Sequence, residues 1–271
     1  MQFIVQGYPA YAYTGGRAFD PNLPPIVFIH GAAFDHSVWQ WQSRYFAHHG
    51  YSVLALDLPG HGRSPGAVRA TIEEWAQWLA DFFDAACLSN VSLVGQSMGS
   101  LIALETALKH GGRLAKLALV ATAVPMPVGD AFMAAALDRS SAALDMEAVW
   151  GHSRHAQLMQ SPVPGTTLLG ASRSLNGRSK PGVLHAALHA CNNYRPSMEA
   201  VRALRLPTLV LAGMRDQMTQ FKAGKALAAE IPGAKLVALD VGHSMMSEAP
   251  REVLQALRDF LADSRGQAPI S

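Results

Sequence analysis

Short, almost continuous apolar runs recur along the chain, and they predict strands that are buried on both faces of a sheet. These runs are rich in Val, Ile, Leu and Ala, and they cover residues 26–30, 52–56, 91–94, 116–121, 208–212 and 235–239. Two further runs near the start, QFIVQ and AYAYT, flank a turn at residues 7–9. Their arrangement predicts an antiparallel pair of strands ahead of the parallel ones.

Helical patterns alternate with these strands. Apolar positions recur at helical spacing in residues 71–86, 97–110, 220–231 and 251–262. The first of these segments begins with Thr71 followed by Glu74, which is the spacing of a capping box. Strands that alternate with helices in this way predict an α/β fold with a doubly wound, mostly parallel sheet.

The alternation stops after residue 124, and only helical periodicity is visible from there to about residue 200. We therefore expect residues 125–200 to form a helical cap that is inserted after the sixth strand. Residues 1–124 and 201–271 would then build the core domain around the sheet. A chain of 271 residues is long enough to bury a core of this size.

Charge and cysteine content exclude several classes of protein. The 22 Lys and Arg residues nearly balance the 20 Asp and Glu residues, and no basic cluster marks a surface for nucleic acid. The two cysteines, Cys87 and Cys191, form neither a disulfide framework nor a zinc motif. The first residues lack a signal-peptide pattern, and the uncharged run at residues 117–129 is too short to span a bilayer. We expect a cytoplasmic protein with no nucleic-acid partner and no membrane partner.

A serine stands between two glycines at the point where a predicted strand meets a predicted helix. Residues 95–99 read GQSMG, with Ser97 at the centre. This spacing matches the nucleophile elbow, a sharp turn that presents a serine hydroxyl at the end of a buried strand. The motif arises by chance in about one chain in ten of this length. An ordinary glycine-rich turn is therefore the competing interpretation unless other residues support the elbow.

The first supporting feature is the sequence HGAAF, which follows the strand predicted at residues 26–30. In hydrolases with a nucleophile elbow, the loop at this place donates one backbone N–H to a developing oxyanion, and the residue after the nucleophile donates the other. The predicted donors are the amides of Ala32, with Ala33 as the alternative, and of Met98. We also expect Ala33 and Phe34 to contact the substrate.

Two later strands end close to a carboxylate and an imidazole. Asp216 follows one strand and His243 follows the next, so the chain order is Ser97, Asp216, His243, as in hydrolases that use an elbow serine. In that arrangement the carboxylate orients the imidazole, which accepts the serine proton. Asp240 competes with Asp216 for this role. We favour Asp216, because Asp240 closes its strand and does not stand in a loop that faces the serine.

The chain resembles proteins of the α/β-hydrolase fold along nearly its whole length. The residues that carry the resemblance read HGAAF, DLPGHGRS, GQSMG, LVLAGMRD and VGHSMMSEAP. The DLPGHGRS loop is especially characteristic of the serine esterase, haloperoxidase-like and C–C hydrolase branches. The resemblance implies a nucleophile, an acid, a base and two oxyanion donors, which are Ser97, Asp216, His243 and the amides of Ala32 and Met98. It also implies that residues 125–200 control substrate entry.

Two residues in these motifs are not expected to act on the substrate. Gln96 stands where many relatives carry histidine, and the resemblance implies that this side chain faces away from the substrate. Asp57, which begins the DLPGHGRS loop, is expected to anchor that loop by hydrogen bonds and to take no part in catalysis.

The cap contains two pairs of histidines that share a helical face, His152 with His155 and His185 with His189. Such pairs can bind a metal. No glutamate follows His185 in the metalloprotease pattern and no third ligand is evident, so we expect no metal and no cofactor.

Together these features predict a cofactor-independent serine hydrolase that cleaves a small or medium carboxylic ester with an apolar acyl group. The same residues would also serve C–C bond, lactone or amide hydrolysis, acyl transfer or perhydrolysis, so these reactions remain alternatives. A non-catalytic ligand receptor on the same fold is an alternative of another class. The sequence leaves the oligomeric state open, with a homodimer among the candidates.

Overall fold

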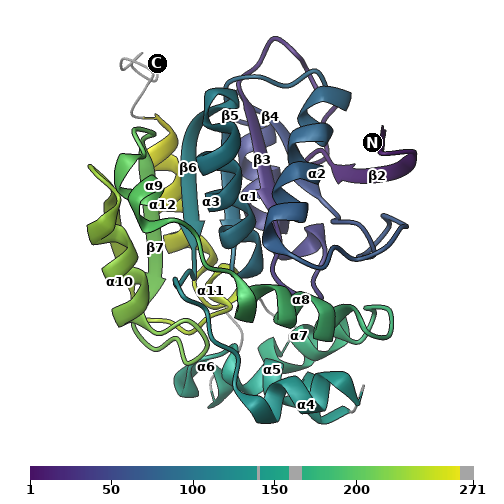
Figure 1. Ribbon diagram of the computed structural model, residues 1–271, viewed down its shortest axis with the longest axis vertical. Helices are drawn as coiled ribbons and strands as arrows, with labels where there is room; N and C mark the ends of the chain where they lie inside the picture. The colour runs from purple at the N-terminus through teal and green to yellow at the C-terminus, as the bar shows by residue number, and fades with distance from the viewer. Residues whose placement is uncertain (139–140, 159–166, 263–271) are drawn as a thin grey trace.

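The computed structural model describes residues 1–138, 141–158 and 167–262, and these residues are built around one sheet. The sheet has eight strands in the order β1-β2-β4-β3-β5-β6-β7-β8 (Figure 1). The strands are β1 Gln2–Val5, β2 Tyr8–Tyr13, β3 Pro25–Ile29, β4 Ser52–Leu56, β5 Val91–Gln96, β6 Leu114–Val120, β7 Thr208–Gly213 and β8 Lys235–Leu239. The β1–β2 and β2–β4 pairs are antiparallel and all later pairs are parallel. The predicted doubly wound, mostly parallel sheet is confirmed.

Alternate residues of the central strand β3 enter two separate cores. Val27 and Ile29 belong to the larger cluster, and Ile26 and Phe28 belong to the cluster on the other face. Helices α2 (Ile72–Ala85) and α3 (Met98–His110) cover one face, and α1 (Gln40–Ala47) and α12 (Pro250–Ala262) cover the other (Figure 1). Because both faces are buried, the strands have almost no polar positions, which explains the continuous apolar runs in the sequence.

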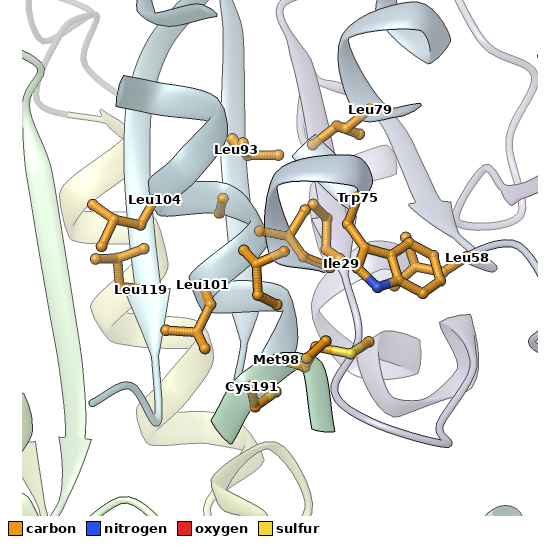
Figure 2. Packing of buried hydrophobic residues seen from close by; sticks show 14 of the residues in the cluster. Ile29, Leu58, Trp75, Leu79, Leu93, Met98, Leu101, Leu104, Leu119 and Cys191 are labelled. Atoms are coloured by element: carbon orange, nitrogen blue, oxygen red, sulfur yellow. The ribbon is translucent and has the colours of Figure 1, made fainter. Parts of the chain in front are cut away.

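The larger cluster joins α2 and α3 to the sheet (Figure 2). Trp75 and Leu79 of α2 and Leu101 of α3 lie over strand residues such as Ile29 in this view. The predicted cap of α2 is present, because Thr71 Oγ1 accepts a hydrogen bond from the Glu74 amide at 3.2 Å. This bond satisfies one of the free amides at the helix start and sets where α2 begins.

Between β6 and β7 the chain forms a helical insertion at the carboxyl ends of the parallel strands (Figure 1). Its helices are α4 Asp130–Leu137, α5 Ser141–Trp150, α6 Arg154–Leu158, α7 Leu168–Asn176, α8 Val183–Asn193 and α9 Met198–Ala203. The predicted helical insertion after the sixth strand is therefore observed. The division into a core domain, residues 1–124 and 201–271, and a cap, residues 125–200, stays a prediction.

The remaining elements complete the loops and the far edge of the sheet. They are two short 3-10 helices, His36–Trp39 and Gly111–Arg113, and the helices α10 Phe221–Glu230 and α11 Met245–Glu248. Within the described part of the chain, no helix combines the length and the apolar character that a bilayer crossing requires.

Candidate active site

Ser97 occupies a strained turn between β5 and α3. Its backbone has φ 53° and ψ −121°, an uncommon conformation for a residue with a side chain, and such a conformation costs roughly 1–3 kcal/mol. The turn is held on both sides, because the Ser97 amide donates to Val120 O at 3.0 Å and the Ser100 hydroxyl donates to Ser97 O at 2.6 Å. The strain and the support are the local features of a nucleophile elbow.

The two glycines of GQSMG are required by close contact with the backbone. A Cβ atom at Gly95 would collide with the carbonyl oxygen of Gly99. A Cβ atom at Gly99 would lie 2.6 Å from the carbonyl oxygens of both Ile29 and His30. Strand β5, helix α3 and the end of β3 therefore meet at distances that admit only glycine, which is the physical reason for the spacing of the motif.

His30 fixes the loop that follows β3, a role that the sequence did not reveal. Its Nε2 accepts a hydrogen bond from the Leu58 amide at 3.1 Å, so the proton resides on Nδ1, which donates to Gly31 O at 2.7 Å. Burial lowers the pKa of His30, in agreement with a neutral ring. A Cβ atom at Gly31 would lie 3.2 Å from the Ser97 Cβ, so this loop passes directly over the elbow.

The predicted residues of the HGAAF loop separate in space. Ala32 and Phe34 line a cavity of about 290 Å³ together with Ser97. Ala33 has φ 56° and is buried, and it is not among the described residues that line this cavity. Met98 begins α3 and its side chain belongs to the larger core cluster (Figure 2). The roles of Ala32 and Met98 as amide donors stay predictions.

Asp216 and His243 lie side by side in the interior. The Nδ1 atom of His243 donates a hydrogen bond to Asp216 Oδ2 at 2.9 Å, and both side chains are buried. Burial would raise the pKa of Asp216, but the adjacent imidazole lowers it below its usual value. Burial would likewise lower the pKa of His243, but the Asp216 carboxylate raises it above its usual value. The Asp216 carboxylate therefore stabilises the charge that the His243 ring gains when it accepts a proton, and Nε2 is the nitrogen left to exchange that proton.

Backbone donors and one hydroxyl orient the Asp216 carboxylate. Its Oδ1 accepts from the amides of Met218 and Thr219 at 2.8 and 2.7 Å, and its Oδ2 accepts from the Thr219 hydroxyl at 2.6 Å. Thr219 was not identified from the sequence, although an aspartate side chain often accepts hydrogen bonds from the backbone amides that follow it. These donors leave Oδ2 facing His243.

Asp240 has a different environment. Its two carboxylate oxygens accept hydrogen bonds from Arg215 at 2.5 and 2.7 Å, and this ion pair is exposed. The Arg215 guanidinium lowers the pKa of Asp240. The structure therefore brings Asp216, and not Asp240, to His243.

Ser97 and His243 line the same cavity, and most of its wall is apolar. The helical insertion supplies much of this wall, with Met126, Pro127, Val128, Gly129, Phe132, Glu147, Trp150, Leu188 and Cys191. The other lining residues are Ala32, Phe34, Gln217, Met218 and Thr219. Gln96 is buried and is absent from both sets, and neither polar atom of its amide has a hydrogen-bond partner in the described structure.

One acidic residue of the cavity was missed by the sequence analysis. Glu147 of α5 is only 5% exposed, and its Oε2 atom has no hydrogen-bond partner in the described structure. Burial raises the pKa of Glu147 to about 7, although the nearby His243 partly opposes this shift. No local motif marks this glutamate, because its environment is created by the packing of the insertion against the sheet.

Replacing Glu147 with glutamine is expected to stabilise the protein at neutral pH and much less in acid. Between the ordinary pKa of 4.5 and the raised value of about 7, the folded state binds more protons than the unfolded chain. The free energy of unfolding of the wild type therefore falls as the pH rises through this window. The total loss is on the order of 3 kcal/mol, and a glutamine does not suffer it. Urea unfolding of both proteins at about pH 5 and pH 8 measures the difference.

Asp145→Asn is the matched control for this experiment, because it removes a carboxyl from the same helix. The Asp145 side chain is exposed and pairs with Arg173 at 2.5 Å. Such a surface pair is worth less than about 1 kcal/mol, so the control should alter stability little at either pH. If Glu147→Gln changed the unfolding free energy equally at both pH values, the shifted ionisation of Glu147 would be contradicted.

One cluster of described residues has the composition of a metal site, but its atoms are already engaged. The ligand atoms of Asp35, His36 and Asp57 lie within 4.8 Å of one another. Asp57 accepts from the His36 ring at 2.7 Å and from the amides of His36 and Arg63, each at 2.8 Å. Asp35 accepts from the Ser37 amide at 2.9 Å. These bonds join the two loops and agree with the anchoring role expected for Asp57.

Comparison with known proteins adds independent information. A model of the alpha/beta hydrolase family matches residues 26–256 of the chain. The chain is 29% identical over 246 residues to the pimeloyl-(acyl-carrier protein) methyl ester esterase of Chromobacterium violaceum, which is 88% of this chain and 94% of that one. It is 40% identical to an (E)-2-((N-methylformamido)methylene)succinate hydrolase of Acinetobacter baylyi, but only over 79 residues, which are 29% of this chain and 30% of that one.

Among solved structures, the enol-lactonase of Burkholderia xenovorans has the same fold. It superposes with a TM-score of 0.85 at 23% identity, and the match covers 97% of this chain and 100% of that one. At this identity the likeness concerns the architecture.

Proposed function

The chain belongs to the alpha/beta hydrolase family, and on this premise we propose that it is a cofactor-independent serine hydrolase that cleaves carboxylic esters of small or medium size. The observation that carries the proposal is the shared cavity. Ser97 lines it from its strained turn, and His243, which is hydrogen-bonded to Asp216, lines it from another element. A methyl ester esterase among the relatives supports the ester as the substrate class.

The reaction begins with acylation of Ser97. Its hydroxyl oxygen attacks the ester carbonyl carbon, and His243 Nε2 accepts the proton as the bond forms. The Asp216 carboxylate stabilises the resulting imidazolium. The amides of Ala32 and Met98 donate hydrogen bonds to the oxyanion, and loss of one such donor typically costs about 100- to 1,000-fold in kcat.

Acylation is completed when the protonated His243 donates its proton to the leaving alcohol, which departs and leaves the acyl group on Ser97. Deacylation then uses the same groups with water in place of the serine. His243 then removes a proton from a water molecule, and the hydroxide attacks the acyl carbon. The acid is released and Ser97 recovers its proton. The apolar wall of the cavity suits an apolar acyl group, and a cytoplasmic location remains part of the proposal.

A fluorophosphonate probe tests the nucleophile directly. We expect one label per chain, on the peptide that contains Ser97, and a parallel loss of p-nitrophenyl acetate hydrolysis. Labelling at another residue, or full turnover by the labelled protein, would overturn the proposal. A protein that is labelled but hydrolyses no ester, thioester, lactone or amide would instead favour a ligand receptor.

A further inference from the structure

Glu147 comes from the helical insertion, yet hydrogen bonds hold its segment against the loop of His243. The Ser244 amide donates to Gly151 O at 2.7 Å, just beyond the end of α5. The Glu248 carboxylate accepts from the Ser153 amide and hydroxyl, both at 2.8 Å, and from the Gly242 amide at 3.1 Å. Glu147 is thus placed relative to His243 by a short, partly buried network of hydrogen bonds and not by a free loop.

The carboxyl of Glu147 has fewer partners than a buried acidic group normally has. Its Oε2 atom has no hydrogen-bond partner in the described structure, and the neighbouring Asn176 amide and His243 imidazole offset only part of the cost of its burial. No lysine or arginine is found among the described residues that line the cavity. A carboxylate held in this way is costly to the fold unless a ligand supplies the missing charge or donor.

Two aromatic rings line the cavity together with Glu147. Trp150 lies three residues further along α5, so its side chain projects from nearly the same face of the helix. Its ring meets the ring of Phe132 edge to face, with centroids 5.7 Å apart and an interplanar angle of 83°. Aromatic rings beside a carboxylate form the usual environment for an alkylammonium group, which ring electrons attract through cation–π contacts.

We propose that Glu147, Trp150 and Phe132 form a subsite for a cationic group, so that the preferred substrate is an ester that carries an ammonium. The inference rests on the proposed function, because it assigns the substrate class of the same cavity. The cation would pair with the Glu147 carboxylate and contact the two rings, while the ester carbonyl lies at Ser97. Glu147 places a carboxyl group in the wall of the cavity, so a substrate carboxylate is disfavoured at this place.

Matched pairs of esters provide the test, because each pair differs only in charge. Acetylcholine is compared with 3,3-dimethylbutyl acetate, and the p-nitrophenyl ester of 4-(trimethylammonio)butanoate is compared with that of 5,5-dimethylhexanoate. The first pair has the charge on the alcohol side and the second has it on the acyl side. In at least one pair, the wild type should prefer the cationic ester by about tenfold or more in kcat/KM.

Variants then assign the preference to the subsite. Glu147→Gln should reduce the ratio of kcat/KM for the cationic ester to kcat/KM for its neutral partner about 10- to 100-fold, mainly through the KM of the cationic ester. Trp150→Leu should reduce the preference by about three- to tenfold. The control Asp145→Asn removes the same charge from the exposed side of α5 and should leave the preference unchanged.

The outcomes separate this inference from the proposed function. If the wild type hydrolyses neutral and cationic esters equally, or if Glu147→Gln loses both equally, the subsite is wrong and the hydrolase proposal stands. If no ester is hydrolysed, the hydrolase proposal fails, and calorimetry with choline and its neutral analogue 3,3-dimethylbutan-1-ol decides the subsite. Binding of choline that weakens at least tenfold in Glu147→Gln would support it, whereas equal binding of both compounds would overturn it.

Discussion

Replacing Ser97 with alanine is expected to reduce ester hydrolysis by about ten-thousandfold or more, since the reaction loses the atom that forms the acyl-enzyme. The amides of the oxyanion site and the imidazole would remain, but they would act only on a bound substrate and a water molecule. The substitution removes one oxygen atom from a half-buried residue. The fold should therefore persist, and the measured loss should lie in kcat.

The experiment compares initial rates of p-nitrophenyl acetate hydrolysis for the wild type and Ser97→Ala at equal concentrations of folded protein. Ser92→Ala is the matched control, because Ser92 lies on the same strand, β5, and does not line the cavity. The control should retain wild-type kcat. Turnover by Ser97→Ala at the wild-type rate would show that another group is the nucleophile.

Asp216→Asn is expected to lower kcat by about 10,000-fold, because an asparagine does not hold His243 in the tautomer that leaves Nε2 free. Asp240→Asn is the control with the same chemical change. It breaks only the exposed pair with Arg215, so kcat should remain near that of the wild type. The reverse result would transfer the carboxylate role to Asp240.

The pH profile of Asp216→Asn provides a second measurement. The Asp216 carboxylate raises the pKa of His243, while burial lowers it. Without the carboxylate the burial effect dominates, so the acid limb of the residual kcat/KM should move to lower pH. An acid limb that stays in place would mean that the rate does not depend on the ionisation of His243.

The strands of the sheet were largely predictable from the sequence. The ranges 52–56 and 235–239 were predicted exactly as β4 and β8, since a short apolar run bounded by polar or turn residues has few other stable arrangements. Strand β5 continues to Gln96, two residues beyond its predicted end. The prediction stopped early because the polar Gln96 looks like a strand boundary in the sequence, although its side chain is buried. Helix ends were predicted at least as well. For example, α10 covers Phe221–Glu230, one residue less at each end than the predicted range 220–231.

The candidate site was only partly predictable. Ser97, Asp216 and His243 were identified because each follows a strand, and the carboxyl ends of parallel strands meet at one edge of a sheet. Glu147 gave no comparable signal. It lies in a segment whose pattern predicts only helix, and nothing near it in the sequence shows that it is buried next to a histidine almost a hundred residues further along.

The sequence by itself determined the class of fold, the position of the turn at Ser97 and the order of the three candidate catalytic groups. Those properties depend on local spacing, such as apolar periodicity and the glycines on either side of Ser97. The tertiary structure alone decided that Asp216 and not Asp240 reaches His243, that Thr219 and His30 hold the neighbouring loops, and that Glu147 enters the cavity. These outcomes depend on distances between side chains from separate elements, which are set only when the two faces of the sheet and the helical insertion pack together.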